Sequence, residues 1–130
     1  MADELILQNF MAKSAIKAGQ AVANVASNDR LAPQCQPAGV TTEKIQVLGI
    51  SLKDSAAGEA VTIQPLVTGK IIQCRAGAAV TAGVPLGIDA NGDFVDADTG
   101  TAAAPLWSID SAAAAGDYFC AVIVHTCGVI

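Results

Sequence analysis

The residue best suited to acid–base chemistry in this sequence is His125, its only histidine. In a catalytic site it would act as a general base that activates a nucleophile such as Cys127. Residues two apart on a strand share a face but do not approach each other as a catalytic pair must, and the chain has no Gly-x-Ser-x-Gly motif. We therefore interpret His125 as an ordinary histidine at a strand end, and we expect no catalytic residues and no enzymatic activity.

The acidic stretch Asp89–Asp98 is the candidate for binding a cation. Its first residues place oxygen-bearing side chains at alternate positions, as the opening of a calcium loop does. An EF-hand, however, needs glycine where this chain has Phe94 and glutamate where it has Gly100. The pair Asn91-Gly92 also predicts a type I′ hairpin turn. We expect a hairpin and no bound metal or other cofactor, and we keep a β-barrel that binds calcium or a small ligand as an alternative function.

Four cysteines could suggest disulfides or a zinc site: Cys35, Cys74, Cys120 and Cys127. No two of them have the spacing of two to four residues that zinc knuckles use. The first residues, Met1–Glu4, are acidic where an export signal would be basic. We therefore expect synthesis in the cytoplasm of the producing cell, with reduced thiols that pack as small apolar side chains.

Three other side chains could carry chemistry or binding. Asp54 and Glu59 could form a general acid/base pair, but both lie among small residues typical of a turn, which makes them turn-forming groups. Trp107, the only tryptophan, could anchor a ligand or a subunit contact, although burial beside the core is the more ordinary role for this residue type.

The composition argues against nucleic acid and membrane as partners. Charged residues make up 15% of the chain and hydrophobic residues 52%, with a net charge of -5. The basic residues are scattered singly, and no apolar run approaches the roughly 20 residues of a membrane-spanning helix. A surface with this little charge predicts that some apolar area is covered by another protein.

Short apolar runs broken by Gly, Pro, Asn and Asp predict a mainly β fold, a single small β-barrel or β-sandwich domain. Tyr118–His125 is expected as a central strand because it is apolar on both faces. The Ala-rich stretches Thr101–Ala104 and Ala112–Ala115 are expected as loops or single turns, and Pro65 as part of an edge strand or as a strand end. The other expected strands are Ile45–Leu52, Val61–Gln64, Ile71–Arg75 and Val84–Ile88, the last leading through the hairpin to Phe94–Val95.

The first residues of the chain differ from the rest. Residues 1–18 hold apolar side chains at mixed spacings without Gly or Pro, which fits an amphipathic helix or an extended arm that orders on a partner. We favour the arm, so that the chain divides into an N-terminal arm (1–18) and a β domain (19–130). The residues expected to contact a partner or another subunit are Leu5, Ile6, Phe10 and Met11 of the arm, together with Trp107.

One pattern occurs twice along the chain. Leu48-Gly49-Ile50 precedes an acidic, small-residue turn and an apolar strand, and Leu106-Trp107-Ser108-Ile109 precedes a similar turn and strand. This predicts either two similar hairpins on one barrel or a common turn sequence used twice.

A family resemblance rests on the order of several short motifs. They are Gly19–Val22, Val47–Leu52, the turn and strand Asp54–Ile63, Ala79–Leu86 and the Asn91-Gly92 hairpin. This order resembles that of the small capsid decoration (cement) proteins of tailed bacteriophages, over roughly Gly19–Ile130. The resemblance implies an Ala/Gly/Val-rich β domain, typically a trimer, on the outside of an expanded icosahedral head, with no catalytic residues.

The function expected from these observations is structural. A cement protein adds binding energy across many weak seams of a shell, and side chains that lose little entropy on ordering suit that task. The expected partners are the major capsid protein and further copies of the chain in a homotrimer. The expected location is the outer capsid surface of the virion after synthesis in the host cytoplasm. A head-fibre or tail component is the alternative within the same class.

Overall fold

The computed structural model describes residues 6–25, 33–38, 47–97 and 102–124, and these residues contain strands and turns but no α-helix. The mainly β prediction is therefore confirmed. No helix in the described ranges has the length and apolar character that crossing a membrane requires. The strands are β1 (Leu7–Ala12), β2 (Ala21–Val25), β3 (Gln34–Pro37), β4 (Val47–Ser51), β5 (Ala60–Pro65), β6 (Ile71–Arg75), β7 (Pro85–Ile88), β8 (Phe94–Asp96), β9 (Ala102–Ser108) and β10 (Tyr118–Ile123).

The first half of the chain forms a closed barrel with the strand order β1-β3-β2-β4-β5. Strand β1 closes it, because it pairs antiparallel with β5 and parallel with β3. The segment expected as an arm thus supplies a barrel strand from Leu7 to Ala12, and this chain's own sheet satisfies its backbone. Pro65 ends β5, as expected of a residue that cannot donate a backbone hydrogen bond.

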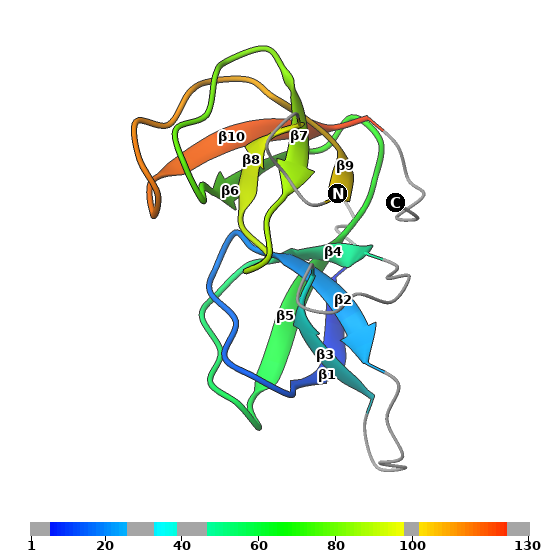
Figure 1. Ribbon diagram of the computed structural model, residues 1–130. Helices are drawn as coiled ribbons and strands as arrows, with labels where there is room; N and C mark the ends of the chain where they lie inside the picture. Colours follow the sequence, from blue (N-terminus) through cyan, green and yellow to red (C-terminus); the bar gives the residue numbers. More distant parts are fainter. Residues whose placement is uncertain (1–5, 26–32, 39–46, 98–101, 125–130) are drawn as a thin grey trace.

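The second half is a five-stranded sheet with the order β6-β10-β9-β7-β8. Its two outer strands approach each other at one parallel bridge, between Ala76 and Phe94. Figure 1 shows the two halves stacked, with β6–β10 above β1–β5 in that view. Strand β10 lies between β6 and β9, which confirms the expected central strand.

The two halves repeat one another. In both, the first strand pairs with the fifth, the second with the third and fourth, and the fourth with the fifth. Backbone hydrogen bonds outside the strands also recur in matched pairs, which extends the twofold pattern seen in the sequence to the whole half. The matched donor–acceptor pairs are Ile16–Ser55 and Val80–Ala112, Gly19–Ser51 and Gly83–Ser108, Gly58–Ala12 and Gly116–Ala76, and Lys13–Cys35 and Gly77–Phe94.

One kind of turn helps to build both halves. The turns Ala56–Glu59 and Ala114–Asp117 each place a glycine with positive φ third, and the N–H of the fourth residue bonds back to the carbonyl of the first. The carboxylate of the fourth residue accepts the N–H of the first, at 2.8 Å for Glu59 and 3.2 Å for Asp117. The turn-forming role expected of Glu59 is confirmed. Asp54 differs from the expected turn-forming role, because its Oδ1 accepts the N–H of Ala18 at 2.8 Å and so links its loop to the one before β2.

The two halves have different cores. The barrel interior is filled by Ala12, Ile16, Val22, Cys35, Val61 and Ile63. At the matched places of Cys35 and Val61, the second half has Phe94 and Phe119. These larger side chains need more room, and the second half is an open sheet whose core includes residues on the outside of the barrel, among them Ala21, Val47 and Ile50.

Two local predictions are wrong. The Asn91-Gly92 hairpin is present, but only Gly92 has a positive φ, so the turn is not type I′. The Asp89 carboxylate instead accepts the N–H of Asn91 at 2.8 Å and holds a turn of type I with a left-handed glycine after it. The described part of the stretch expected as a loop, Ala102–Ala104, is a strand, because β9 begins at Ala102. Pairing of Ala102 and Ala103 with β7 overrides the low strand propensity of alanine.

Candidate functional site

The junction of the two halves is built by the β7–β8 turn and the end of β6. The N–H of Ala21 donates to the carbonyl of Gly92, and the N–H of Arg75 donates to the carbonyl of Gly19, both at 2.9 Å. A Cβ on Gly92 would lie 2.7 Å from the Cβ of Pro37, so only glycine allows this approach. The turn sits directly on the barrel.

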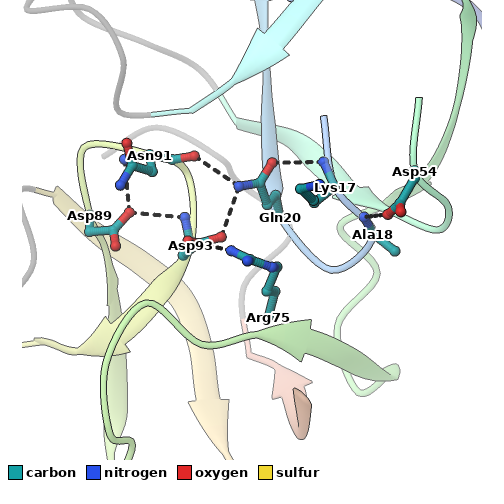
Figure 2. Close-up of polar contacts among 8 residues, drawn as sticks. All are labelled: Lys17, Ala18, Gln20, Asp54, Arg75, Asp89, Asn91 and Asp93. Carbon is teal, nitrogen blue, oxygen red and sulfur yellow. Dashed lines mark hydrogen bonds and ion pairs between the residues drawn. The ribbon is translucent and has the colours of Figure 1, made fainter. Parts of the chain in front are cut away.

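A buried network of hydrogen bonds centred on Gln20 holds the two halves together at this junction. Its Nε2 donates to the Oδ1 of Asp93 at 2.8 Å and to the carbonyl of Asn91 at 3.0 Å, and its Oε1 accepts the N–H of Lys17 at 2.9 Å. Figure 2 shows Gln20 lying between the β7–β8 turn and its own loop. Because Gln20 is only 5% exposed, every one of these bonds replaces water that the amide cannot reach.

Asp93 joins this network to β6. Its Oδ2 forms an ion pair with Nη1 of Arg75 at 2.8 Å, as Figure 2 shows. The hydrogen bond that Arg75 donates to Asp93 raises the pKa of Arg75 above its ordinary value. The ion pair therefore ties together the β7–β8 turn and the strand that lies against Gly19.

The acidic stretch Asp89–Asp98 acts here as a structural joint. Oδ1 of Asp89 accepts backbone N–H groups from Asn91 and Asp93, and both carboxylate oxygens of Asp93 accept side-chain donors. Asp98 lies outside the described residues. In the described ranges no three His, Cys, Asp or Glu side chains gather as metal ligands would. Three of the four carboxylate oxygens of Asp89 and Asp93 thus accept donors of the protein itself.

An exposed apolar row crosses the outer face of the second half. Ile71 pairs with Val122, Val122 with Trp107, and Trp107 with Pro85, so the four residues stand side by side on β6, β10, β9 and β7. Ile71 is 59% exposed and Trp107 46%, Pro85 is also exposed, and Val122 is half-buried. We call these four residues the outer row.

The matched row of the barrel is buried. Ala21 pairs with Ile50 and Ile50 with Gln64, as Pro85 pairs with Trp107 and Trp107 with Val122. Ala21 and Ile50 are fully buried and Gln64 is 3% exposed. Ala21 and Ile50 belong to the core of the second half, which therefore covers this row of the first.

The residues expected to make partner contacts fall into three environments. Leu5 lies outside the described residues. Ile6 is 37% exposed just before β1, whereas Phe10 and Met11 are half-buried in β1 and Phe10 packs against the barrel core. Trp107 is exposed, so the expectation that it is buried beside the core is wrong. Of this set, the structure leaves Ile6 and Trp107 most open to a partner.

The remaining candidates are His125 and the cysteines. His125 and Cys127 lie outside the described residues. Cys35 and Cys74 are buried free thiols and Cys120 is half-buried, in agreement with the expectation of small apolar packing. Burial raises the pKa of Cys35 from 9.0 to about 11, which keeps this thiol protonated at neutral pH.

Sequence reasoning did not find the junction or the outer row. Gln20 and Asp93 are far apart in the chain, and no local pattern marks them as partners. The signal in the sequence that could have pointed to them is an alignment of the first half of the chain with the second. Ala12, Ile16 and Gly19 match Ala76, Val80 and Gly83 through their hydrogen bonds, and alanine also recurs at the matched positions 15 and 79, and 18 and 82.

Comparison with known proteins gives a structural likeness. No family model matches the chain, and no curated protein matches it. Among solved structures, the N base of the head fibre protein gp8.5 of bacteriophage phi29 matches with a TM-score of 0.68 and 18% sequence identity. The match covers 97% of this chain and 99% of that one. The two chains share a fold.

Proposed function

We propose that this chain is a structural protein of a phage virion, carried on the outside of the head. The observation that carries the proposal is the likeness to the base of a phage head fibre, which extends over 97% of the chain and so includes both halves and their junction. The short motifs that resemble capsid decoration proteins support the same class of function. No catalytic role is part of the proposal.

Two finer roles are compatible with this class. As a cement protein the chain would link neighbouring shell subunits and strengthen an expanded head through many copies. As the base of a head fibre it would bind the shell on one side and carry a fibre on the other. The resemblance of motifs supports the first role, and the likeness to the phi29 fibre base supports the second.

The proposed contact with the major capsid protein lies at the start of the chain, with Leu5 and Ile6. Ile6 is 37% exposed immediately before β1, so an apolar side chain is open to a partner there. The two residues Phe10 and Met11 are less suited to this role, because they lie half-buried in a strand that closes the barrel.

The test is binding to expanded phage heads that lack this protein, with the position of the bound protein read by electron microscopy. We expect density on the outer surface of the head. Density at the seams between shell subunits would select the cement role, and density beneath a fibre would select the base. Failure to bind heads, or density confined to the tail, would contradict the proposal.

A variant series tests the contact at the start of the chain. Deletion of residues 1–5 combined with Ile6→Glu should weaken head binding and leave the melting temperature unchanged. The truncation stops short of β1, because removal of Leu7–Ala12 would open the barrel. The matched control is Leu52→Glu, which changes another exposed apolar residue of the first half, 42% exposed. Equal loss of binding in both variants would contradict a contact at Ile6.

A further inference from the structure

Asn91-Gly92 is the one place in the chain where glycine follows asparagine, and Asn91 is exposed to water. Asparagine before glycine deamidates spontaneously, because glycine has no side chain to shield its backbone nitrogen. A bond forms between the nitrogen of Gly92 and Cγ of Asn91, and the Cγ–Nδ2 bond breaks. The proton of the Gly92 N–H leaves with Nδ2 as ammonia. Water then opens the cyclic imide to aspartate or isoaspartate.

The closed junction holds every backbone polar group of this dipeptide. The N–H of Asn91 donates to Oδ1 of Asp89 at 2.8 Å, and the N–H of Gly92 donates to the carbonyl of Asp89 at 3.2 Å. The carbonyl of Asn91 accepts Nε2 of Gln20 at 3.0 Å, and that of Gly92 accepts the N–H of Ala21 at 2.9 Å. Figure 2 shows Asn91 between Asp89 and Gln20. The turn thus binds both N–H groups, and the barrel binds both carbonyls.

Ring closure requires a rotation that these contacts prevent. A type I turn holds ψ of its third residue near 0°, roughly 120° from the angle at which the next nitrogen meets Cγ. Rotation to that angle would break the bonds to Gln20 and Ala21 and move the backbone of Gly92, which is buried. The surroundings leave no space for this movement, because a Cβ on Gly92 would already lie 2.7 Å from the Cβ of Pro37. Asn91 therefore reacts only when the junction is open.

The isoaspartate product does not fit the closed junction. Its main chain passes through Cβ and Cγ of residue 91, so the path between the bond to Gln20 and the bond to Ala21 is longer by a methylene group. The former backbone carbonyl of residue 91 becomes a carboxylate close to Asp89 and Asp93, which are themselves acidic. Both changes weaken the contact that had prevented the reaction.

We propose that Asn91 is a deamidation site that the closed junction keeps unreactive and that separation of the two halves activates. The substrate is the chain's own Asn91-Gly92 peptide, and the co-reactant is water. Once isoaspartate has formed, the junction cannot close as before. The proposal stands apart from the proposed role on the phage head, because it concerns the purified chain alone.

The test is timed incubation of the full chain at neutral pH, folded and in urea, followed by peptide mapping with mass spectrometry and an assay for isoaspartate. We expect conversion of Asn91 in urea. In the folded chain the reaction should be at least about 30-fold slower, which corresponds to an opening free energy of about 2 kcal/mol or more. The other asparagines, Asn9, Asn24 and Asn28, have larger following residues and should react more slowly than Asn91 in urea.

Asp93→Ala tests whether the junction provides the protection. It removes the side-chain acceptor of Gln20 next to the turn and should speed the reaction of the folded chain by about 30-fold, toward its own rate in urea. Asp117→Ala is the matched control, because it removes a turn bond of the second half away from the junction and should leave the folded rate within about twofold. Gln20→Ala removes the bond to the Asn91 carbonyl and keeps the test valid if Asp93→Ala does not fold.

The modified chain itself tests the effect of the product on the junction. Chain that has been converted in urea, refolded and separated as the isoaspartate form should melt at a lower temperature than Asn91→Asp. That variant carries the same added charge on a backbone of ordinary length. Equal melting temperatures would overturn the inference that isoaspartate prevents closure.

Three results would overturn the protection by the junction. The first is an equal rate at Asn91 in the folded chain and in urea. The second is the absence of conversion at Asn91 in urea. The third is equal acceleration by Asp93→Ala and Asp117→Ala, which would assign the protection to stability in general. Failure to bind phage heads would overturn the proposed function and leave this inference standing.

Discussion

The two halves of this protein have one strand plan and opposite surfaces at a matched row. In the barrel, Ala21 and Ile50 are buried under the second half, while their counterparts Pro85 and Trp107 face solvent. The buried row has small or medium side chains and lies beside the hydrogen bond between Gln20 and Asp93. The exposed row has a large aromatic side chain and no such hydrogen bond beside it. Repetition of a fold therefore does not repeat its surfaces, because each unit is shaped by what covers it.

The interiors differ in a related way. The barrel closes on itself around side chains no larger than isoleucine, together with a half-buried Phe10 at its edge. The second half contains Phe94 and Phe119 at matched places, stays open apart from one bridge, and fills its interior with the help of the barrel's outer face. The barrel is a complete unit, and the second half is completed by the barrel.

The sharpest test of this comparison is truncation at one matched pair of positions. Ile50→Ala should lower the free energy of unfolding by roughly 3–4 kcal/mol, because it leaves a cavity between the halves. Trp107→Ala should cost less than about 1 kcal/mol in the free chain, because its side chain is already half in water. Urea unfolding at low protein concentration measures both. Equal costs would mean that the two rows do not differ as described.

Alanine at two matched glycines tests whether the halves touch through their backbones. At Gly19 a Cβ would lie 2.6 Å from the backbone nitrogen of Arg75, whereas at Gly83 it would meet nothing within 4 Å. Both have positive φ, so each variant carries about 1–2 kcal/mol of backbone strain. Gly19→Ala should cost about 3 kcal/mol in total, since the junction must also move. A thermal or urea melt in which Gly83→Ala is the more harmful variant would contradict this junction.

Removal of two aspartates separates the junction from an ordinary turn. Asp93→Ala removes one of the two acceptors of the buried Gln20 amide and the side-chain acceptor of Arg75, and should cost roughly 2–3 kcal/mol. Asp117→Ala removes an exposed turn bond and should cost less than about 1 kcal/mol. Chemical unfolding of both variants provides the measurement. If the dependence of the unfolding free energy on denaturant concentration decreases for Asp93→Ala alone, the two halves of that variant unfold separately.

The smallest expected effect concerns alkaline pH and the barrel interior. Burial raises the pKa of Cys35 from 9.0 to about 11, so the folded state holds this proton longer than the unfolded chain. Its contribution to stability is complete below about pH 9 and is lost as the pH rises toward about 11, a change on the order of 2 kcal/mol. Urea unfolding across this range should show a smaller decline for Cys35→Ala. An identical decline in that variant would assign the effect to other groups.

The sequence by itself determined where most strands lie. Alternating or continuous apolar runs, bounded by Gly, Pro and Asp, predicted β4, β5, β6, β7 and β10 within a few residues, because burial on one face requires that period. The turn role of Glu59 followed from its small neighbours. Trp107 was named as a contact residue, and that role stays a prediction.

Only the tertiary structure decided which strands pair, which turn forms at Asp89 and which face is covered. The bonds from Gln20 to Asp93 and from Arg75 to Gly19 join residues far apart in the sequence, and no local pattern encodes such a meeting. The exposure of Trp107 depends on the same long-range packing. An apolar side chain is more stable when buried, but the arrangement of the whole chain determines whether a neighbouring element covers it.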